Sequence, residues 1–147
     1  MATMSVRTPD AIIAGFAQSF MSNAKWVKLI TCLVANADVI KHARLKLVWD
    51  DEVRTFLFSE HSAYDFDFYV SSVESMVSGK PLGFYHYKDF EWLEIPSRYH
   101  VRKDPNNHKA GFVECEHDLA HIETVLAQVG ALQIEASADA LRIWAYR

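Results

Sequence analysis

The most distinctive chemical feature of this 147-residue chain is a group of carboxylates and aromatic rings between residues 50 and 69. Carboxylates that lie close together could carry out acid–base chemistry or hold a divalent cation. They also suit a basic protein partner, because acids speed the encounter and aromatic rings anchor the centre of an interface. The residues that we predict to bind such a partner are Asp50, Asp51, Glu60, Tyr64, Asp65 and Asp67. A simpler interpretation, a hairpin turn and a strand whose polar face lies in water, stays open.

A second candidate site is a pair of histidines late in the chain. His117 and His121 are four residues apart, a spacing that lets two imidazoles on one side of a helix share a metal ion, and Cys115 lies just upstream. However, the run His-Asp-Leu-Ala-His lacks the glutamate that zinc hydrolases use as a general base after the first histidine. Two solvated histidines near a helix start are the simpler interpretation. We therefore predict no metal site and no cofactor, and keep a small metal-dependent enzyme or regulator using these three residues as an alternative.

The third candidate is a basic stretch between residues 97 and 109, which could bind phosphate or RNA through charge and stacking. Its members are Arg98, Tyr99, His100, Arg102, Lys103, His108 and Lys109. The whole chain has a formal charge of −4, whereas proteins that bind nucleic acids usually carry a basic excess. We expect a solvated polar loop here and no nucleic-acid partner.

Nucleophilic catalysis has no recognisable signature in the sequence. There is no Gly-x-Ser-x-Gly elbow, and the five glycines do not form a phosphate-binding loop. Neither cysteine has a nearby histidine and acid beyond the proximity of Cys115 to His117. We predict that the protein is not an enzyme.

The composition indicates one folded domain over residues 1–147, with residues 1–7 flexible. Half of the residues are hydrophobic and 13% are aromatic, enough apolar surface to build a core without disulfides. Cys32 and Cys115 are far apart in the sequence, which favours a reducing compartment. No secretory signal or long apolar span is present, so we expect a cytoplasmic protein without a membrane partner.

The elements that must position these residues begin with an amphipathic helix over residues 24–35. Trp26, Leu29, Ile30, Leu33 and Val34 share one face, and Ser22 or Asn23 can cap its start. Further helices are predicted over residues 9–21, 71–79 and 117–129, the last with Gly130 as its stop.

Alternating hydrophobic residues predict strands between these helices. They occur at 44–49 and 53–58, which form a hairpin, at 64–70, 84–95 and 110–115, and at 132–136 and 141–145, which form a second hairpin. Strands with helices at both ends predict an α+β fold. We expect one antiparallel sheet of hairpins, covered by an N-terminal helix pair and a C-terminal helix.

Three stretches together resemble a family of small bacterial proteins that are similar to immunity proteins of polymorphic toxin systems. They are the run from Ser22 to Leu29, the run from Phe90 to Pro96 and the terminal run from Leu141 to Tyr146. The resemblance implies a protein that binds and neutralises a cognate toxin by occluding its active site. It transfers no binding residues, because immunity proteins use surfaces that differ from one toxin to the next. An adaptor subunit with a non-toxic partner is a further alternative.

Overall fold

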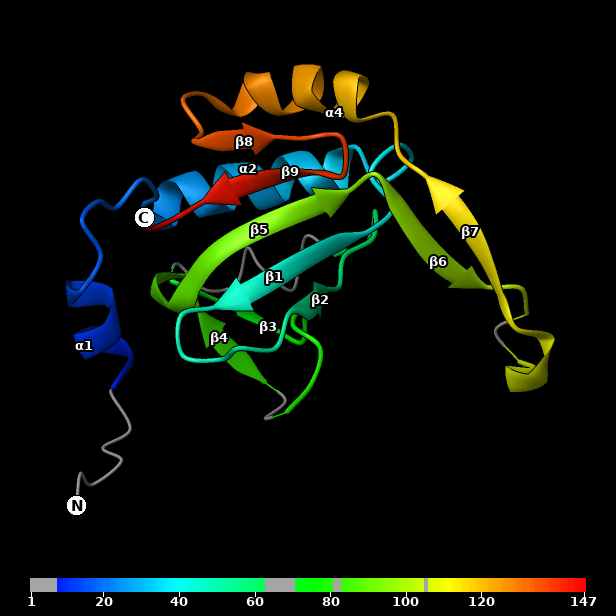
Figure 1. Cartoon of the computed structure of the whole chain (residues 1–147), viewed down its shortest axis with the longest axis horizontal. Helices are drawn as coiled ribbons and strands as arrows, with labels where there is room; N and C mark the ends of the chain where they lie inside the picture. The colour runs from blue at the N-terminus through cyan, green and yellow to red at the C-terminus, as the bar shows by residue number, and fades with distance from the viewer. Residues whose placement is uncertain (1–7, 63–70, 81–82, 105) are drawn as a thin grey trace.

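The computed structural model describes residues 8–62, 71–80, 83–104 and 106–147 of the chain. Its central element is a five-stranded antiparallel sheet with the strand order β2-β1-β5-β9-β8 (Figure 1). The strands are β1 (Ala43–Leu47), β2 (Arg54–Phe56), β5 (Phe90–Pro96), β8 (Ile134–Ala136) and β9 (Ala140–Trp144). β9 is the last strand in the sequence, yet it lies between β5 and β8. The predicted α+β class is confirmed, as are the hairpins β1–β2 and β8–β9.

Helix α2 (Asn23–Ala35) packs its apolar face against the sheet, as predicted. Its start is fixed by the Ser22 hydroxyl, which accepts a hydrogen bond from the Lys25 amide at 3.2 Å. All five predicted apolar residues of this helix are buried. They share one core with Leu45, Leu93 and Ile143, which are paired across β1, β5 and β9.

Helix α4 (Leu119–Leu126) continues into the 3₁₀ turn η3 (Ala127–Val129) and packs against α2 and β9. It contributes Ile122, Val125 and Leu126 to the core, and Figure 1 shows it lying along the β8 edge. The Asp118 carboxylate accepts a hydrogen bond from the His121 amide and caps the helix. The helix predicted over 117–129 is therefore present, but His117 precedes its first turn.

The N-terminal helix pair is only partly confirmed. α1 (Pro9–Ala14) is short and buries none of its residues, and the predicted continuation to residue 21 is wrong. The chain leaves the helix at Gly15, and the amides of Ala17 and Phe20 donate to the carbonyls of Arg147 and Ala145 at 2.9 and 2.8 Å. Pairing with the end of the chain thus replaces the helical hydrogen bonds of this segment.

A helix predicted over 71–79 is also wrong, because this segment contains strand β3 (Ser72–Glu74). β3 pairs with β4 (Phe84–His86), and the 3₁₀ turn η1 (Tyr87–Asp89) joins β4 to β5. The residues that follow β3 pair with the end of the β1–β2 hairpin, since the Leu57 amide donates to the Met76 carbonyl at 2.6 Å. The apolar residues Val73, Met76 and Val77 are buried, as a helix would also have required.

The polar loop predicted over 97–109 is wrong in its first half. Residues Arg98–Arg102 form β6, which pairs with β7 (Phe112–Glu116), and the 3₁₀ turn η2 (His108–Ala110) lies between them. These two strands form a separate two-stranded sheet that projects away from the central sheet (Figure 1). The strand predicted over 64–70 lies outside the described residues.

Candidate functional site

The predicted acidic site begins at the turn after β1, and its shape is fixed by Asp50 and Arg54. Asp50 Oδ1 accepts a hydrogen bond from the Glu52 amide at 3.0 Å, and Oδ2 accepts one from Arg54 Nε at 2.9 Å. The bond from the Glu52 amide, together with Arg54, lowers the pKa of the Asp50 carboxyl. Both oxygens of Asp50 therefore hold the turn in place.

Arg54 also ties this turn to the β3–β4 sheet. Its Nη1 donates to the Tyr85 hydroxyl at 2.6 Å and to the Ser78 carbonyl at 3.2 Å, and its Nη2 donates to the Lys80 carbonyl at 2.9 Å. Its guanidinium carbon lies 5.3 Å from the ring centroids of Trp49 and Tyr85, whose planes are within 12° of parallel. We call this set, with Asp50, the Arg54 network. It makes the turn a rigid part of the surface.

The six residues predicted to bind a partner are only partly placed by the structure. Asp50 and Asp51 lie together in the turn after β1, and Asp51 is exposed. Glu60 lies beyond β2, where its side chain is 76% exposed and pairs with His61 at 3.3 Å. Tyr64, Asp65 and Asp67 lie outside the described residues. Their assignment to a partner-binding surface stays a prediction.

Exposed apolar side chains around the turn are a feature that the sequence patterns missed. Trp49 and Val53 are 37% and 48% exposed, although both are large and apolar. Trp49 continues the alternation of Leu45 and Leu47, which indicated a core-facing residue. β1 ends at Leu47, however, and the turn carries Trp49 outward. Acidic and apolar side chains therefore share this surface.

The late histidines do not form the arrangement that a shared metal ion requires. His117 is buried, its Nδ1 lies 2.7 Å from the Pro96 carbonyl, and its Nε2 accepts the Lys41 amide at 2.9 Å. Both ring nitrogens are thus occupied by backbone groups, while His121 is exposed on α4. Among the described residues, no group of three histidines, cysteines or acids is placed to hold a metal ion. His117 is also not the solvated residue that the simpler interpretation required.

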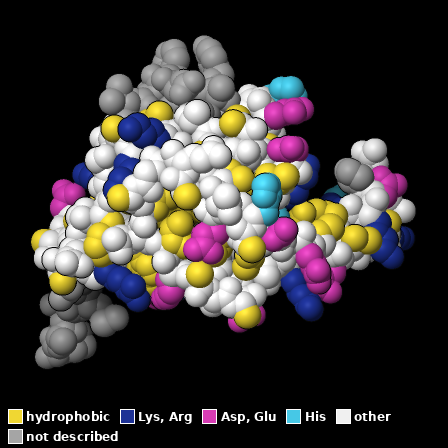
Figure 2. Space-filling view, turned by 90° about the horizontal axis from the view of Figure 1, so that it is seen from above, with side chains coloured by type: hydrophobic (Ala, Val, Ile, Leu, Met, Phe, Trp, Pro, Cys, Tyr) yellow, Lys and Arg dark blue, Asp and Glu magenta, His cyan; other side chains and the backbone are white. Residues whose placement is uncertain are grey.

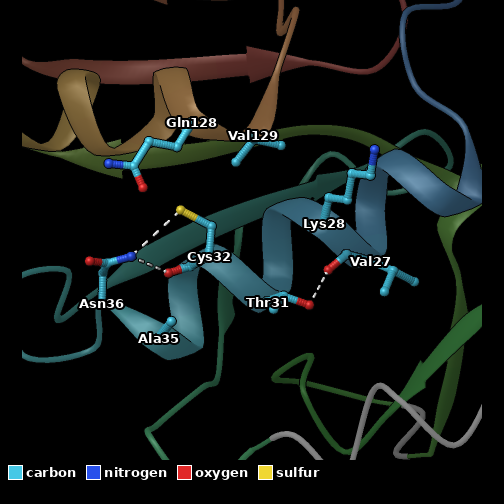
Figure 3. Close-up of a pocket in the computed structure, with 8 residues that line it drawn as sticks. All are labelled: Val27, Lys28, Thr31, Cys32, Ala35, Asn36, Gln128 and Val129. Carbon is cyan, nitrogen blue, oxygen red and sulfur yellow. Dashed lines mark hydrogen bonds between the residues drawn. The ribbon is translucent and has the colours of Figure 1, made fainter.

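A groove of about 420 Å³ lies between α2 and η3 (Figure 3). Two of its polar side chains bond within the groove wall: the Thr31 hydroxyl donates to the Val27 carbonyl at 2.6 Å, and the Asn36 side-chain amide donates to the Cys32 carbonyl at 2.8 Å. Burial raises the pKa of the Cys32 thiol, which keeps it protonated near neutral pH. The groove offers an apolar surface and no activated nucleophile.

Comparisons with known proteins add no functional assignment. Neither protein-family models, nor curated proteins, nor solved structures match this chain. Among the described helices, none combines the length and the apolar character needed to span a bilayer.

Proposed function

We propose that this protein is an immunity-type protein, which binds a cognate bacterial toxin and occludes its active site without chemistry of its own. The observation that carries the proposal is the Arg54 network, which holds an exposed acidic turn and exposed apolar side chains in one fixed arrangement. Rigid aromatic groups surrounded by charge are typical of the centres of protein interfaces. The resemblance to immunity proteins gives the partner its proposed identity.

The acidic residues and the apolar residues have different roles in this proposal. Asp51 and Glu60, with Asp65 and Asp67, attract a basic surface and increase the association rate. Trp49 and Tyr64 supply contact area that is desolvated in the complex, so they control dissociation. Asp50 acts indirectly, since its carboxylate positions the turn through Arg54.

The proposal is tested by expressing the gene immediately upstream, alone and together with this protein, and scoring growth. We expect growth arrest from the toxin alone and rescue by the wild-type protein. In the variant that combines Asp51→Lys, Glu60→Lys, Asp65→Lys and Asp67→Lys, we expect an association rate reduced about tenfold or more.

A matched control is Glu123→Lys, which reverses an exposed charge on α4. We expect this variant to protect as well as the wild type. Unchanged protection and association rate in the fourfold variant would show that this surface is wrongly assigned. A bound partner that is harmless when expressed alone would contradict the immunity function and favour an adaptor.

A further inference from the structure

The hairpin of β6 and β7 is attached to the rest of the molecule through a root, where both of its strands meet the body. β5 ends at Pro96 and β6 begins at Arg98, while β7 ends directly before His117. The His117 amide donates to the Ser97 carbonyl at 2.8 Å, which ties the two chain crossings together. Beyond the root, the hairpin stands apart from the body of the molecule (Figure 2). A change at the root therefore alters how the hairpin is held.

The His117 side chain bonds this root to the loop before β1. Its Nε2 lies 2.9 Å from the Lys41 amide nitrogen, and its Nδ1 lies 2.7 Å from the Pro96 carbonyl oxygen. Because a backbone amide can only donate, Nε2 must be the unprotonated nitrogen, and the ring hydrogen lies on Nδ1. The ring is buried, so water does not replace either partner. The bridge to Lys41 therefore exists only while His117 is neutral.

Ring stacking completes the attachment of the root. The Tyr99 ring stacks on His117 at 4.5 Å and on His42 at 5.7 Å between ring centroids. Lys41 and His42 are consecutive residues, so the loop before β1 supplies both the amide that bonds His117 and the outer ring of the stack. His117 takes part in both contacts, which makes it the residue on which the attachment depends.

The surroundings of His117 favour its neutral form. Burial lowers its pKa, although the hydrogen bond to Pro96 opposes the shift, and burial followed by Arg44 and His117 lowers the pKa of His42. Glu94 pairs with Arg44 and Arg142, and Glu116 pairs with Arg98, so these acids are engaged elsewhere. The titratable and charged groups on the elements that meet at the root are Lys41 and His42 before β1, Arg44 of β1, Glu94 of β5, Arg98 and Tyr99 of β6, Cys115 and Glu116 of β7, Asp118 and His121 at the start of α4, and Asp139 before β9.

We propose that His117 is a pH-sensitive latch, which holds the root of the β6–β7 hairpin while its ring is neutral and releases the root when Nε2 takes up a proton. The added hydrogen faces the Lys41 N–H, so two donors oppose each other and the bond is lost. A buried imidazolium without a carboxylate partner also favours a state in which water reaches it. The body stays folded, because the hydrophobic core contains no described residue of the hairpin. This inference is independent of the proposed toxin-binding function.

The first test follows the wild-type protein by NMR between pH 7.5 and 5. The ring nitrogens of His117 report its tautomer and its titration, and the Lys41 amide reports the latch through its hydrogen exchange, corrected for the intrinsic effect of pH. We expect the Nδ1–H tautomer at pH 7.5 and at least about tenfold lower protection of the Lys41 amide once His117 is protonated, with the same midpoint for both. The Ala145 amide, which donates to the Glu91 carbonyl at 2.8 Å, should remain protected throughout.

The second test compares variants in the same exchange measurement. His117→Gln keeps an oxygen that can accept the Lys41 amide but does not titrate, so the protection of Lys41 should change by less than about twofold between pH 7.5 and 5. The matched control His121→Gln, on the exposed side of α4, should keep the tenfold loss. His42→Gln should keep it as well, because His42 does not bond the Lys41 amide.

Several outcomes overturn the proposal. One is a Lys41 amide whose protection does not change with pH in the wild type, and another is an equal loss in His117→Gln. Abolition of the loss in His42→Gln would make His42 the titrating group instead. The proposal also fails if His117 takes up its proton only when circular dichroism shows that the whole protein unfolds. Should His117→Gln not fold, the decisive result is whether the two wild-type midpoints coincide.

Discussion

Arg54, only 9% exposed, contacts three separate segments of the chain and determines the shape of the acidic turn. The sequence identified Asp50 and Asp51 as candidates but gave no sign of Arg54, since its partners Ser78, Lys80 and Tyr85 lie more than 20 residues away. Local patterns do not report such contacts. The composition therefore indicated a candidate site at this turn, while the contacts that hold the turn could not be inferred from the sequence.

Replacing Arg54 should destabilise the protein strongly. In Arg54→Met the Asp50 carboxylate and two backbone carbonyls lose their donor, and we expect the free energy of unfolding to fall by about 2–4 kcal/mol. Arg54→Lys keeps the charge but not the forked geometry, so it should recover only part of this loss. Urea denaturation measures the free energy of unfolding of the wild type, Arg54→Met and Arg54→Lys. A loss below about 1 kcal/mol for Arg54→Met would mean that the network contributes little.

His117 should make stability depend on pH. Burial lowers the pKa of this histidine below its ordinary value of 6.5, although the hydrogen bond to Pro96 opposes the shift. The pKa of His42 is also lowered, by burial and by the neighbouring Arg44 and His117. The unfolded chain therefore takes up protons first as the pH falls. Stability should be complete above pH 6.5 and should decrease from there towards the lower folded pKa values.

The measurement is the free energy of unfolding at several pH values between 7.5 and 5. His117→Gln removes one of the two titrating groups and should flatten the decrease, at a loss of about 1 kcal/mol at neutral pH for its hydrogen bonds. His121→Gln, on the exposed side of α4, serves as the control and should leave the profile unchanged. An identical profile for wild type and His117→Gln would contradict this role.

Among the elements, those with strong local signals were predicted best. Helix α2 has a cap at Ser22 and five apolar residues on one face, and both features agree with its buried position. The segment 71–79 was predicted to be helical, but its pairing with β4 and with Leu57 outweighs that local preference. The same applies to residues 15–21, whose amides pair with the end of the chain. Long-range pairing is the information that a single sequence does not display.

The dominance of α2 in the core gives a direct prediction. Leu33 is fully buried on this helix, so Leu33→Ala should reduce the free energy of unfolding by about 3 kcal/mol through lost packing and a residual cavity. Lys28→Ala on the exposed side of the same helix should change it by less than about 0.5 kcal/mol. Thermal or urea unfolding measures the free energy of unfolding of both variants. Equal losses would mean that the helix is not packed as described.

For the whole molecule, the core and the hairpin of β6 and β7 are separate; we call this hairpin, residues 98–116, the arm. The buried hydrophobic core contains residues from α2, α4 and the central sheet, and none of the described residues between 100 and 114. Composition alone predicted a single domain and did not distinguish this projection, because the basic stretch was interpreted as a loop. The core therefore belongs to the body, and the hairpin lies outside it.

Shortening the arm should therefore leave the body intact. Replacing residues 100–114 with Asn-Gly closes the hairpin just beyond Tyr99 and Cys115 with a favourable two-residue turn. We expect the free energy of unfolding to change by less than about 1 kcal/mol, since the deleted residues lie outside the core. Circular dichroism and urea denaturation measure the outcome. Loss of cooperative unfolding would show instead that the arm supports the body.

The position of β9 bears on how the protein forms in the cell. The ribosome makes this strand after every other strand, although β5 and β8 both depend on it for their hydrogen bonds. While β9 is unfinished, β5 keeps one open edge and uncovered Leu93 and Ile95, which is a typical starting point for aggregation. Chains truncated before Ala140 should accordingly accumulate in inclusion bodies, whereas chains that include β9 should stay in the soluble fraction.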